Sequence, residues 1–328
     1  MPKLTIQQIA ELAGVNKATV SRVLNGNAKI SEKTRRKVEA IMKEYNFVPN
    51  SMARGLAFNR TFMVGFCLDY TDRQSYANPF FYKVLQGIED VVYSRDYQFL
   101  MMSAHHEVRG SAFERVVAEH RVDGLILPGT LLTDRNYQLL TEHDMPFVLT
   151  GGNRLGKENV HWVDIDNVQA GRILTEHLIG MGHRQIVLFA TEETINRDKF
   201  ILDRLQGYRE AMLAHGLSPQ IIRRADELAS LDAPEEVHAI MMTTQDRLLE
   251  FLDWEQHNPL HDAVNLATFD QIPMARYLKF PFHSVEVDLE MMGKEAANML
   301  FRLMEKEDSV PNFVSIKTKI GTAQQEPQ

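Results

Sequence analysis

The stretch Thr5–Gly26 constrains the fold of this chain most, because its pattern predicts two short helices joined by a tight turn. Thr5 and Gln8 have the spacing of a capping box at the start of the first helix. Gly14 suits the left-handed residue that ends a helix, and Asn16 is a favourable N-cap for a second helix. The apolar side chains of the first helix then share one face: Ile6, Ile9, Ala10 and Ala13.

The second helix of this pair has a polar and basic outer face, formed by Lys17, Ala18, Ser21, Arg22 and Asn25. Two small helices with a glycine-containing turn are typical of a helix-turn-helix, whose second helix lies in the major groove of DNA. Arg22 has the planar donors that pair with a guanine edge. Thr19, Ser21 and Asn25 have short polar groups suited to phosphate oxygens. A helical hairpin with a solvated basic face would give the same pattern, so both interpretations remain open at this point.

The charge of the chain is uneven. Residues 1–60 hold eleven Lys and Arg against four Glu, a net +7, whereas the rest of the chain holds 25 basic against 40 acidic residues, a net −15. Such asymmetry indicates a nucleic-acid-binding head on a body that does not bind nucleic acid.

A third helix is expected from Ser31 to about Glu44. Four motifs then stand in order: I-A-x-x-A-G-V from Ile9, K-A-T-V-S-R-V-L-N-G from Lys17, S-E-K-T-R from Ser31 and Y-x-x-x-P-N-x-x-A-R-x-L from Tyr45. Through them, residues 4–56 closely resemble the N-terminus of LacI/GalR-family transcriptional repressors. The resemblance implies a helix-turn-helix DNA-binding domain over residues 1–48 and a hinge helix with its linker over residues 49–60.

By this resemblance, Lys17, Ala18 and Arg22 occupy the base-reading positions. Six residues match phosphate-contacting positions, although on an exposed face they could instead be solvated or cap helices: Thr5, Asn16, Thr19, Ser21, Asn25 and Ser31.

The hinge adds Asn50, Ala53, Arg54 and Leu56 as DNA-binding candidates. Seven residues, 50–56, are too few for a stable isolated helix. The resemblance implies that the hinge folds on DNA, with Leu56 as an apolar wedge in the minor groove. The alternative is that Leu56 packs into the core.

Beyond the hinge, short apolar runs alternate with amphipathic segments. We expect strands at 63–68, 98–102, 122–128, 147–150, 162–164, 186–190, 239–243, 264–268 and 313–319, with 221–222 as a further short strand. We expect helices at 82–95, 113–120, 137–143, 168–181, 202–215, 248–254 and 289–305. The alternation predicts an α/β fold with parallel sheets covered on both faces.

The family resemblance continues through residues 122–126, 166–171, 182–186 and 204–208. It implies an effector-binding and dimerisation core over 61–328, with two doubly wound parallel-sheet subdomains like a periplasmic binding protein. The chain would cross between them near His161, Glu286 and Ser315, giving an N-subdomain of about 61–161 and 286–315 and a C-subdomain of about 162–285 and 316–322. Residues 78–81 and 166–171 look most like the maltose/maltodextrin-operon repressors. Residues 217–239 depart from the family, since they are too short for a full β-α unit, and Gln245 stands where an acid is usual.

The resemblance places the effector site between the two halves, at the carboxyl ends of the strands. Arg204 matches an arginine aimed at a ligand hydroxyl or carboxylate, and Asp270 matches an acidic residue after a strand. A guanidinium facing a carboxylate suits vicinal sugar hydroxyls, which both donate and accept hydrogen bonds. Phe80 and Phe81 would stack on a sugar ring or pack in the core, and Arg154 is a further candidate.

No enzyme, metal or cofactor pattern accompanies these features. His105-His106 would point to opposite faces of a strand, and no HExxH, CxxC or G-x-S-x-G motif is present. Cys67, the one cysteine, lies in an apolar run and is interpreted as a buried small hydrophobe. The N-terminus has no apolar leader, and no run of about eighteen apolar residues exists. We therefore expect a cytoplasmic protein that is not an enzyme, spans no membrane and needs no cofactor.

Together these observations predict a sequence-specific repressor controlled by a small molecule. Two heads that read two half-sites imply a homodimer on near-palindromic double-stranded operator DNA. The leading effector is maltose or a related sugar. The alternatives are a corepressor-dependent regulator of the same fold, using a purine, a sugar phosphate or a protein, and a solute-binding protein, against which the basic head argues. The sign of the response separates the first two, since an inducer weakens operator binding and a corepressor tightens it.

Overall fold

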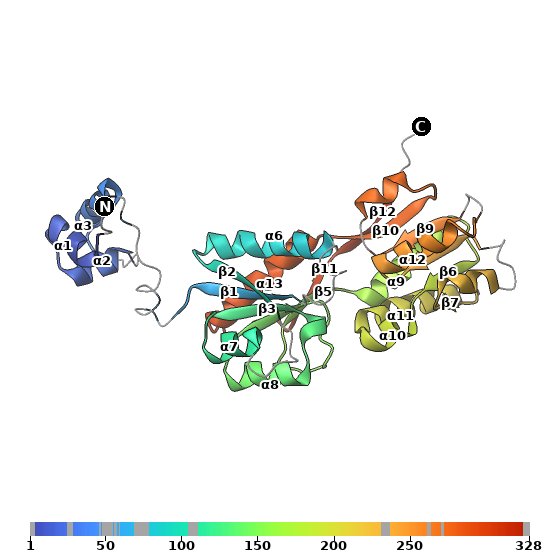
Figure 1. The fold of residues 1–328 in the computed structure, drawn as a ribbon, viewed down its shortest axis with the longest axis horizontal. Helices are drawn as coiled ribbons and strands as arrows, with labels where there is room; N and C mark the ends of the chain where they lie inside the picture. The colour runs from blue at the N-terminus through green and yellow to red at the C-terminus, as the bar shows by residue number, and fades with distance from the viewer. Residues whose placement is uncertain are drawn as a thin grey trace. The chain divides into compact units, whose positions relative to one another are not determined.

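The computed structural model describes residues 4–24, 29–45, 47, 55, 58, 60–68, 79–103, 111–230, 237–260, 264–269 and 272–323. The chain divides into two units, Met1–Phe62 and Met63–Gln328 (Figure 1). Among the helices in these residues, none has the length and apolar content needed to cross a bilayer.

The first unit holds three helices, α1 (Ile6–Ala13), α2 (Lys17–Leu24) and α3 (Glu32–Glu44). The capping box is present, because the Thr5 side chain accepts from the Gln8 backbone N–H and the Gln8 side chain accepts from the Thr5 backbone N–H. Gly14 ends α1 with a φ of 64°. All three helices contribute to the buried core: Ile9, Ala10, Ala13, Val20, Val23 and Val38. The predicted three-helix head is therefore confirmed.

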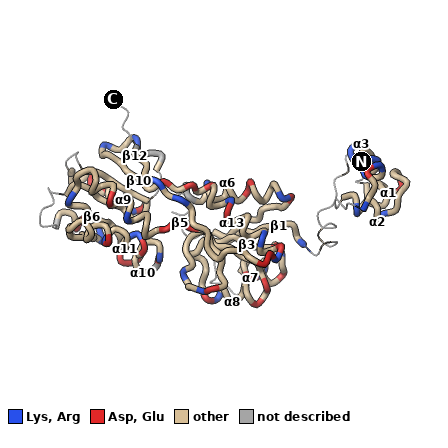
Figure 2. Tube along the Cα trace, turned by 180° about the vertical axis from the view of Figure 1, so that it is seen from behind, with Lys and Arg blue, Asp and Glu red and all other residues tan. Residues whose placement is uncertain are grey.

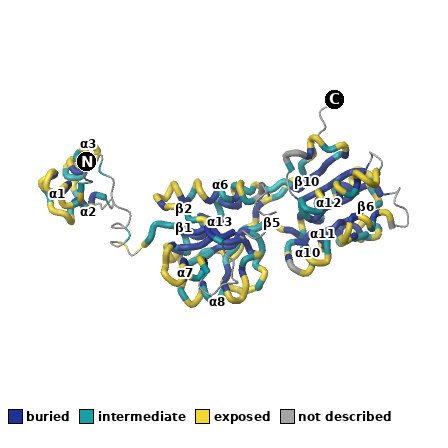
Figure 3. The backbone as a smooth tube through the Cα atoms, viewed as in Figure 1, coloured by how far each residue is buried: buried dark blue, intermediate teal, exposed yellow. Residues whose placement is uncertain are grey.

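The second unit contains two six-stranded sheets. The first has the order β11-β5-β4-β3-β1-β2, and all its strand pairs are parallel. Its strands are β1 (Met63–Leu68), β2 (Gln98–Ser103), β3 (Gly124–Pro128), β4 (Phe147–Thr150), β5 (Trp162–Ile165) and β11 (Phe313–Ile316). Helices α6 (Pro79–Ser94) and α13 (Leu289–Met304) cover one face, and α7 (Ala112–Ala118) and α8 (Asp134–Glu142) cover the other (Figure 1). The central strands are buried, whereas the helices expose their outer faces (Figure 3).

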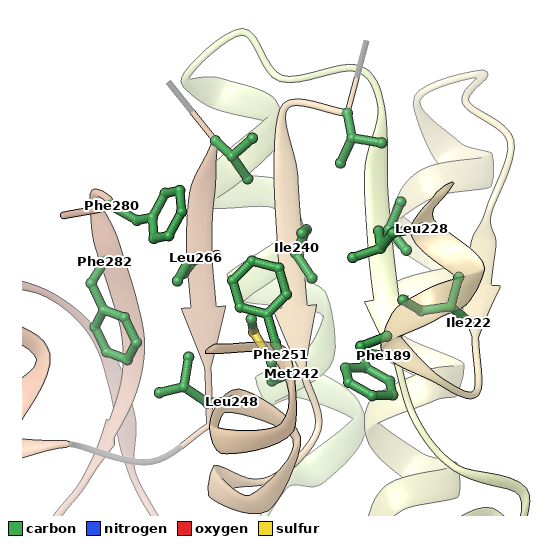
Figure 4. Packing of buried hydrophobic residues seen from close by; sticks show 14 of the residues in the cluster. Phe189, Ile222, Leu228, Ile240, Met242, Leu248, Phe251, Leu266, Phe280 and Phe282 are labelled. Carbon is green, nitrogen blue, oxygen red and sulfur yellow. The ribbon is translucent and has the colours of Figure 1, made fainter. Parts of the chain in front are cut away.

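The second sheet has the order β12-β10-β9-β8-β6-β7, in which only the β10–β12 pair is antiparallel. Its strands are β6 (Ile186–Phe189), β7 (Gln220–Ile222), β8 (Ala239–Met242), β9 (Asn265–Thr268), β10 (Phe282–Val287) and β12 (Thr318–Ala323). Its helices are α9 (Asn167–Gly180), α10 (Glu192–Arg197), α11 (Lys199–Ala214) and α12 (Gln245–Glu255). Figure 4 shows Leu248 and Phe251 of α12 packed on the sheet beside Ile240, Met242 and Leu266. The predicted α/β class with two parallel-sheet subdomains is confirmed, except that the β10–β12 pair is antiparallel.

The chain passes between the two sheets three times, after β5, after β10 and after β11. The first passage differs from the expectation. Residues 162–165 pair with β4 and β11, so they belong to the first half and the passage lies near Asp166 rather than near His161. Residues 313–319, expected as one strand, form β11 and β12 in different sheets, with Lys317 between them. Strand β10 and helix α10 were not expected from the sequence.

The segment from Leu217 to Ala239 is short, as the sequence indicated. Strand β7 has three residues, and a 3-10 helix, η2 (Ala225–Ser230), follows it. Residues 231–236, which include Pro234, lie outside the described residues. Within the described part of this segment, no α-helix follows β7.

In each half, two helices approach closely because glycines face a neighbouring backbone. A Cβ atom added at any of four glycines would overlap a carbonyl oxygen of the partner helix. The glycines are Gly87 and Gly293 in the α6–α13 pair and Gly171 and Gly207 in the α9–α11 pair. The two halves therefore use the same packing device.

We expect Gly87→Ala to lower the free energy of unfolding by about 1–3 kcal/mol, because the added methyl group would force α6 away from the Glu290 carbonyl of α13. Helix propensity alone would instead predict that Gly87→Ala raises the free energy of unfolding by about 1 kcal/mol. Urea denaturation measures the difference. Gly180→Ala is the matched control, because no atom lies within 4 Å of its added Cβ. Equal stability of the two variants would contradict the packing argument.

A buried histidine joins α9 to the second sheet. His283 Nδ1 lies 3.1 Å from His177 Nε2, and His283 Nε2 lies 2.9 Å from Asn265 Oδ1. Because that amide oxygen accepts, neutral His283 carries its proton on Nε2 and accepts from His177. Burial lowers the pKa of His283 to about 4, and the charges of His177 and His183 act in the same direction.

This lowered pKa makes stability depend on pH. The unfolded chain binds a proton at His283 near pH 6.5, whereas the folded protein does so only near pH 4. The stability that neutral His283 contributes is therefore fully present above pH 6.5 and is lost as the pH falls towards 4. The free energy of unfolding should fall by about 2 kcal/mol between pH 7 and pH 5. Urea denaturation at pH 7 and at pH 5 should show a smaller drop in the free energy of unfolding for His283→Gln than for the wild type. His257→Gln, at an exposed histidine, should keep the full drop, and an equal drop in all three proteins would refute the assignment.

Candidate nucleic-acid interface and ligand site

Helix α2 carries the candidate base-reading face. Lys17, Ala18 and Arg22 are exposed, whereas Val20 and Val23 of the same helix are buried against α1 and α3. Within the described residues, Arg22 forms no ion pair. Figure 2 shows Lys and Arg along α2 and α3 of this unit. The face therefore exposes a guanidinium and an ammonium group to solvent, as the sequence predicted, and their contact with DNA stays a prediction.

Three of the predicted phosphate-contacting residues cap helices. Thr5 caps α1 and Ser31 caps α3, where its hydroxyl accepts from the Thr34 backbone N–H. Asn16 Oδ1 accepts from the backbone N–H of Thr19 at 2.7 Å and from the Thr19 hydroxyl at 2.8 Å. These side chains thus fix the starts of the helices, and their contact with phosphate stays a prediction. Asn25, Asn50, Ala53, Arg54 and Leu56 lie outside the described residues.

Arg204 of α11 is held in a buried setting, with 8% of its surface exposed. Its Nε donates to Asn167 Oδ1 at 3.0 Å, and its Nη1 donates to the Thr243 carbonyl at 2.6 Å. The guanidinium carbon lies 4.9 Å from the Phe200 ring centre and 4.5 Å from the Phe269 ring centre. The guanidinium therefore has aromatic contacts and fixed hydrogen bonds, which define its orientation.

These groups gather at the carboxyl ends of the strands, where ligands bind in open α/β sheets. Thr243 follows β8 and Phe269 follows β9. The sequence analysis did not identify the partners of Arg204. Asn167, Thr243 and Phe269 lie far from it along the chain, whereas Phe200 lies four residues before it on the same helix.

Asp164, near the end of β5, is a further polar group that the sequence analysis missed. Its Oδ1 accepts from the Ile165 backbone N–H at 2.8 Å, and its Oδ2 accepts from Asn167 Nδ2 at 3.2 Å. Burial raises the pKa of Asp164 to about 6, although the Ile165 hydrogen bond and the charge of Arg204 oppose this shift. A polar residue at the end of a mostly apolar strand was the one sequence signal for it.

The other predicted ligand residues have less defined positions. Arg154 is exposed in the loop after β4, and Phe81 is partly buried on α6. Asp270 and the side chain of Phe80 lie outside the described residues. Gln245 is the first residue of α12.

The described residues show neither an exposed thiol nor a cluster of metal ligands. Cys67 is buried, as predicted, and burial raises the pKa of its thiol. No group of three or more His, Cys, Asp and Glu in the described part of the chain is arranged to hold a metal ion. His105-His106 lies outside that part.

Three family models match the chain. The model for bacterial regulatory proteins of the lacI family matches residues 5–50. The model for periplasmic binding proteins and the sugar binding domain of the LacI family matches residues 64–242. A periplasmic binding protein-like domain matches residues 175–322.

Individual proteins are similar over nearly the whole length. The chain is 31% identical to the HTH-type transcriptional regulator CelR of Thermobifida fusca, with 96% of each protein covered. It is 28% identical to the regulator MalR of Staphylococcus xylosus, covering 97% of this chain and 96% of MalR. The structure of a CelR–cellobiose complex superposes with a TM-score of 0.67 at 29% identity, covering 97% of this chain and 98% of that one. The structure of a lac repressor dimer bound to operator and the anti-inducer ONPF superposes with a TM-score of 0.72, covering 98% of each chain. At 19% identity this similarity shows a shared fold.

Proposed function

This chain belongs to the LacI family and is a DNA-binding transcriptional regulator, and we propose that it is a repressor that leaves its operator when a small glucose-containing sugar binds to its second unit. The observation that carries the DNA part is α2, which sets Lys17, Ala18 and Arg22 outward from a three-helix core. The relatives CelR and MalR are named as transcriptional regulators and not as enzymes.

On DNA, α2 lies in the major groove and Arg22 contacts a guanine edge. Residues 49–60 form the hinge, with Leu56 as the minor-groove wedge. The phosphate contacts come from six residues: Thr5, Asn16, Thr19, Ser21, Asn25 and Ser31. A homodimer on a near-palindromic operator places two such heads on two half-sites. The lac repressor, similar in fold, is described as a dimer on its operator.

The sugar assignment rests on chemistry and on relatives. Arg204 is a preoriented donor at the carboxyl ends of the strands, and aromatic rings flank it. Asp270, Phe80, Phe81 and Arg154 remain candidates for the same site. CelR is described in complex with cellobiose, and maltose was the leading effector from the sequence. Both sugars are glucose disaccharides, so they define the class to test.

The direct test is fluorescence anisotropy of the purified full-length protein on DNA from upstream of its own gene. Scrambled DNA serves as the control, and maltose and cellobiose are added in turn. Tight binding that either sugar releases supports the proposal. Binding that appears only after a ligand is added would show a corepressor-dependent regulator instead. Equal affinity for upstream and scrambled DNA under all conditions would refute sequence-specific repression.

A further inference from the structure

We propose that Asp164 accepts hydrogen bonds from the hydroxyl groups of the bound sugar and makes release from the operator by that sugar dependent on pH. This inference rests on the proposed sugar-controlled function. It adds a specific carboxylate to the site and a pH range to the response.

Asp164 is linked to Arg204 by one side chain. Asn167 donates from Nδ2 to Asp164 Oδ2 at 3.2 Å and accepts at Oδ1 from Arg204 Nε at 3.0 Å. The two partners fix the orientation of the amide, since a carboxylate only accepts and a guanidinium only donates. Asp164 belongs to the first sheet and Arg204 to α11, so this chain of hydrogen bonds spans the first passage between the halves. A carboxylate and a guanidinium are thereby held at the same site.

Space for a methyl-sized group exists beside the carboxylate. The loop after β4 begins with Gly151 and Gly152, and neither residue has a side chain. A Cβ atom added at Gly152 would lie 3.7 Å from Asp164 Oδ2, which is ordinary van der Waals contact. Alanine would therefore fit at this position without a clash, but its methyl group would occupy the space next to the carboxylate oxygen.

The protonation of Asp164 changes near pH 6. The charged groups that act on it are Arg204 and Lys199, which favour the ionised form, and Asp203, which opposes it; all three are on α11. Burial outweighs them and brings the pKa to about 6. Sugar hydroxyls donate to an ionised carboxylate, whereas a protonated one has lost acceptor capacity. Sugar affinity should therefore be constant above about pH 7 and should fall below pH 6, by roughly tenfold per pH unit in the limit where only the ionised form binds.

The experiment is calorimetric titration of the full-length protein with maltose and with cellobiose between pH 5 and pH 8. Three variants are compared with the wild type: Asp164→Asn, Gly152→Ala and Asp166→Asn. Asparagine at position 164 does not titrate, and its single side-chain oxygen can accept from only one of the two donors, Asn167 Nδ2 or the Ile165 backbone N–H. Asp166→Asn is the matched control, because Asp166 caps α9 through its Oδ1 and asparagine caps equally well.

We expect Asp164→Asn to weaken sugar binding at pH 7 at least tenfold and to remove the fall below pH 6. Gly152→Ala should weaken binding, and Asp166→Asn should match the wild type. All variants should bind operator DNA as the wild type does in the absence of sugar. Weaker binding by Asp164→Asn with the wild-type pH profile would show a merely structural role and overturn the inference. If Asp164→Asn bound sugar with the affinity and the pH profile of the wild type, the inference would also be overturned, but the proposed sugar-controlled repressor would still stand. A wild type that binds operator but neither sugar at any pH would overturn both proposals.

Discussion

Replacing Arg22 with alanine is expected to reduce the preference for operator over random DNA at least thirty-fold, while weak, salt-sensitive binding persists. One bidentate arginine–guanine contact discriminates by about 1–3 kcal/mol. A homodimer makes two such contacts, so operator affinity should fall by roughly 2–6 kcal/mol, which is about thirty-fold to more than ten-thousand-fold. Affinity for random DNA depends on phosphate contacts and should change far less.

The Arg22 variant should keep its fold, since this side chain is exposed and forms no ion pair within the described residues. Anisotropy titrations on operator and scrambled DNA at several salt concentrations measure the ratio of affinities. Arg36→Ala is the control, because Arg36 is an exposed arginine of α3 that pairs with Glu32 at 3.1 Å. An unchanged ratio in the Arg22 variant, or the same loss in the Arg36 variant, would remove Arg22 from base reading.

The DNA-binding head could be predicted from sequence because its signals are local. Thr5, Gln8, Gly14 and Asn16 act within three or four residues of their partners, and the structure shows the capping interactions expected of them. The core sheets were also predictable as short apolar strands between helices. What failed were assignments that depend on distant segments. Residues 162–165 belong to the first sheet because they pair with β4 on one side and with β11, about 150 residues later, on the other.

The same limit applies to the ligand site. Arg204 was identified through the family resemblance, but its partners Asn167 and Thr243 lie 37 and 39 residues away. Asp164 looked like an ordinary polar position in a strand, because burial and not spacing sets its pKa. Lys317 gave no sign of a sheet boundary, since alternation continues on both sides of it. Tertiary proximity, rather than residue type, decides the chemistry of these positions.

Arg204→Ala is expected to leave operator binding intact and to abolish the response to sugar. The guanidinium is the buried donor to Asn167 and to the Thr243 carbonyl, and its removal leaves two acceptors without this donor and a gap beside Phe200 and Phe269. Each buried acceptor left without its donor costs about 1–3 kcal/mol, so for the two acceptors we expect the free energy of unfolding to fall by roughly 2–6 kcal/mol. Typical stabilities are about 5–15 kcal/mol, so the variant should remain folded and bind DNA.

Urea denaturation and operator release by sugar, measured on the same preparations, separate the two effects of Arg204. Arg172→Ala is the matched control, because Arg172 links the same two helices through an exposed ion pair with Glu210. Such a pair contributes about 0–1 kcal/mol, so this control should be nearly as stable as the wild type and should respond fully to sugar. If Arg204→Ala were destabilised yet released from operator at wild-type sugar concentrations, Arg204 would hold the fold together without contacting the ligand. If both properties were unchanged, the buried hydrogen bonds of Arg204 would have no consequence for stability or for control.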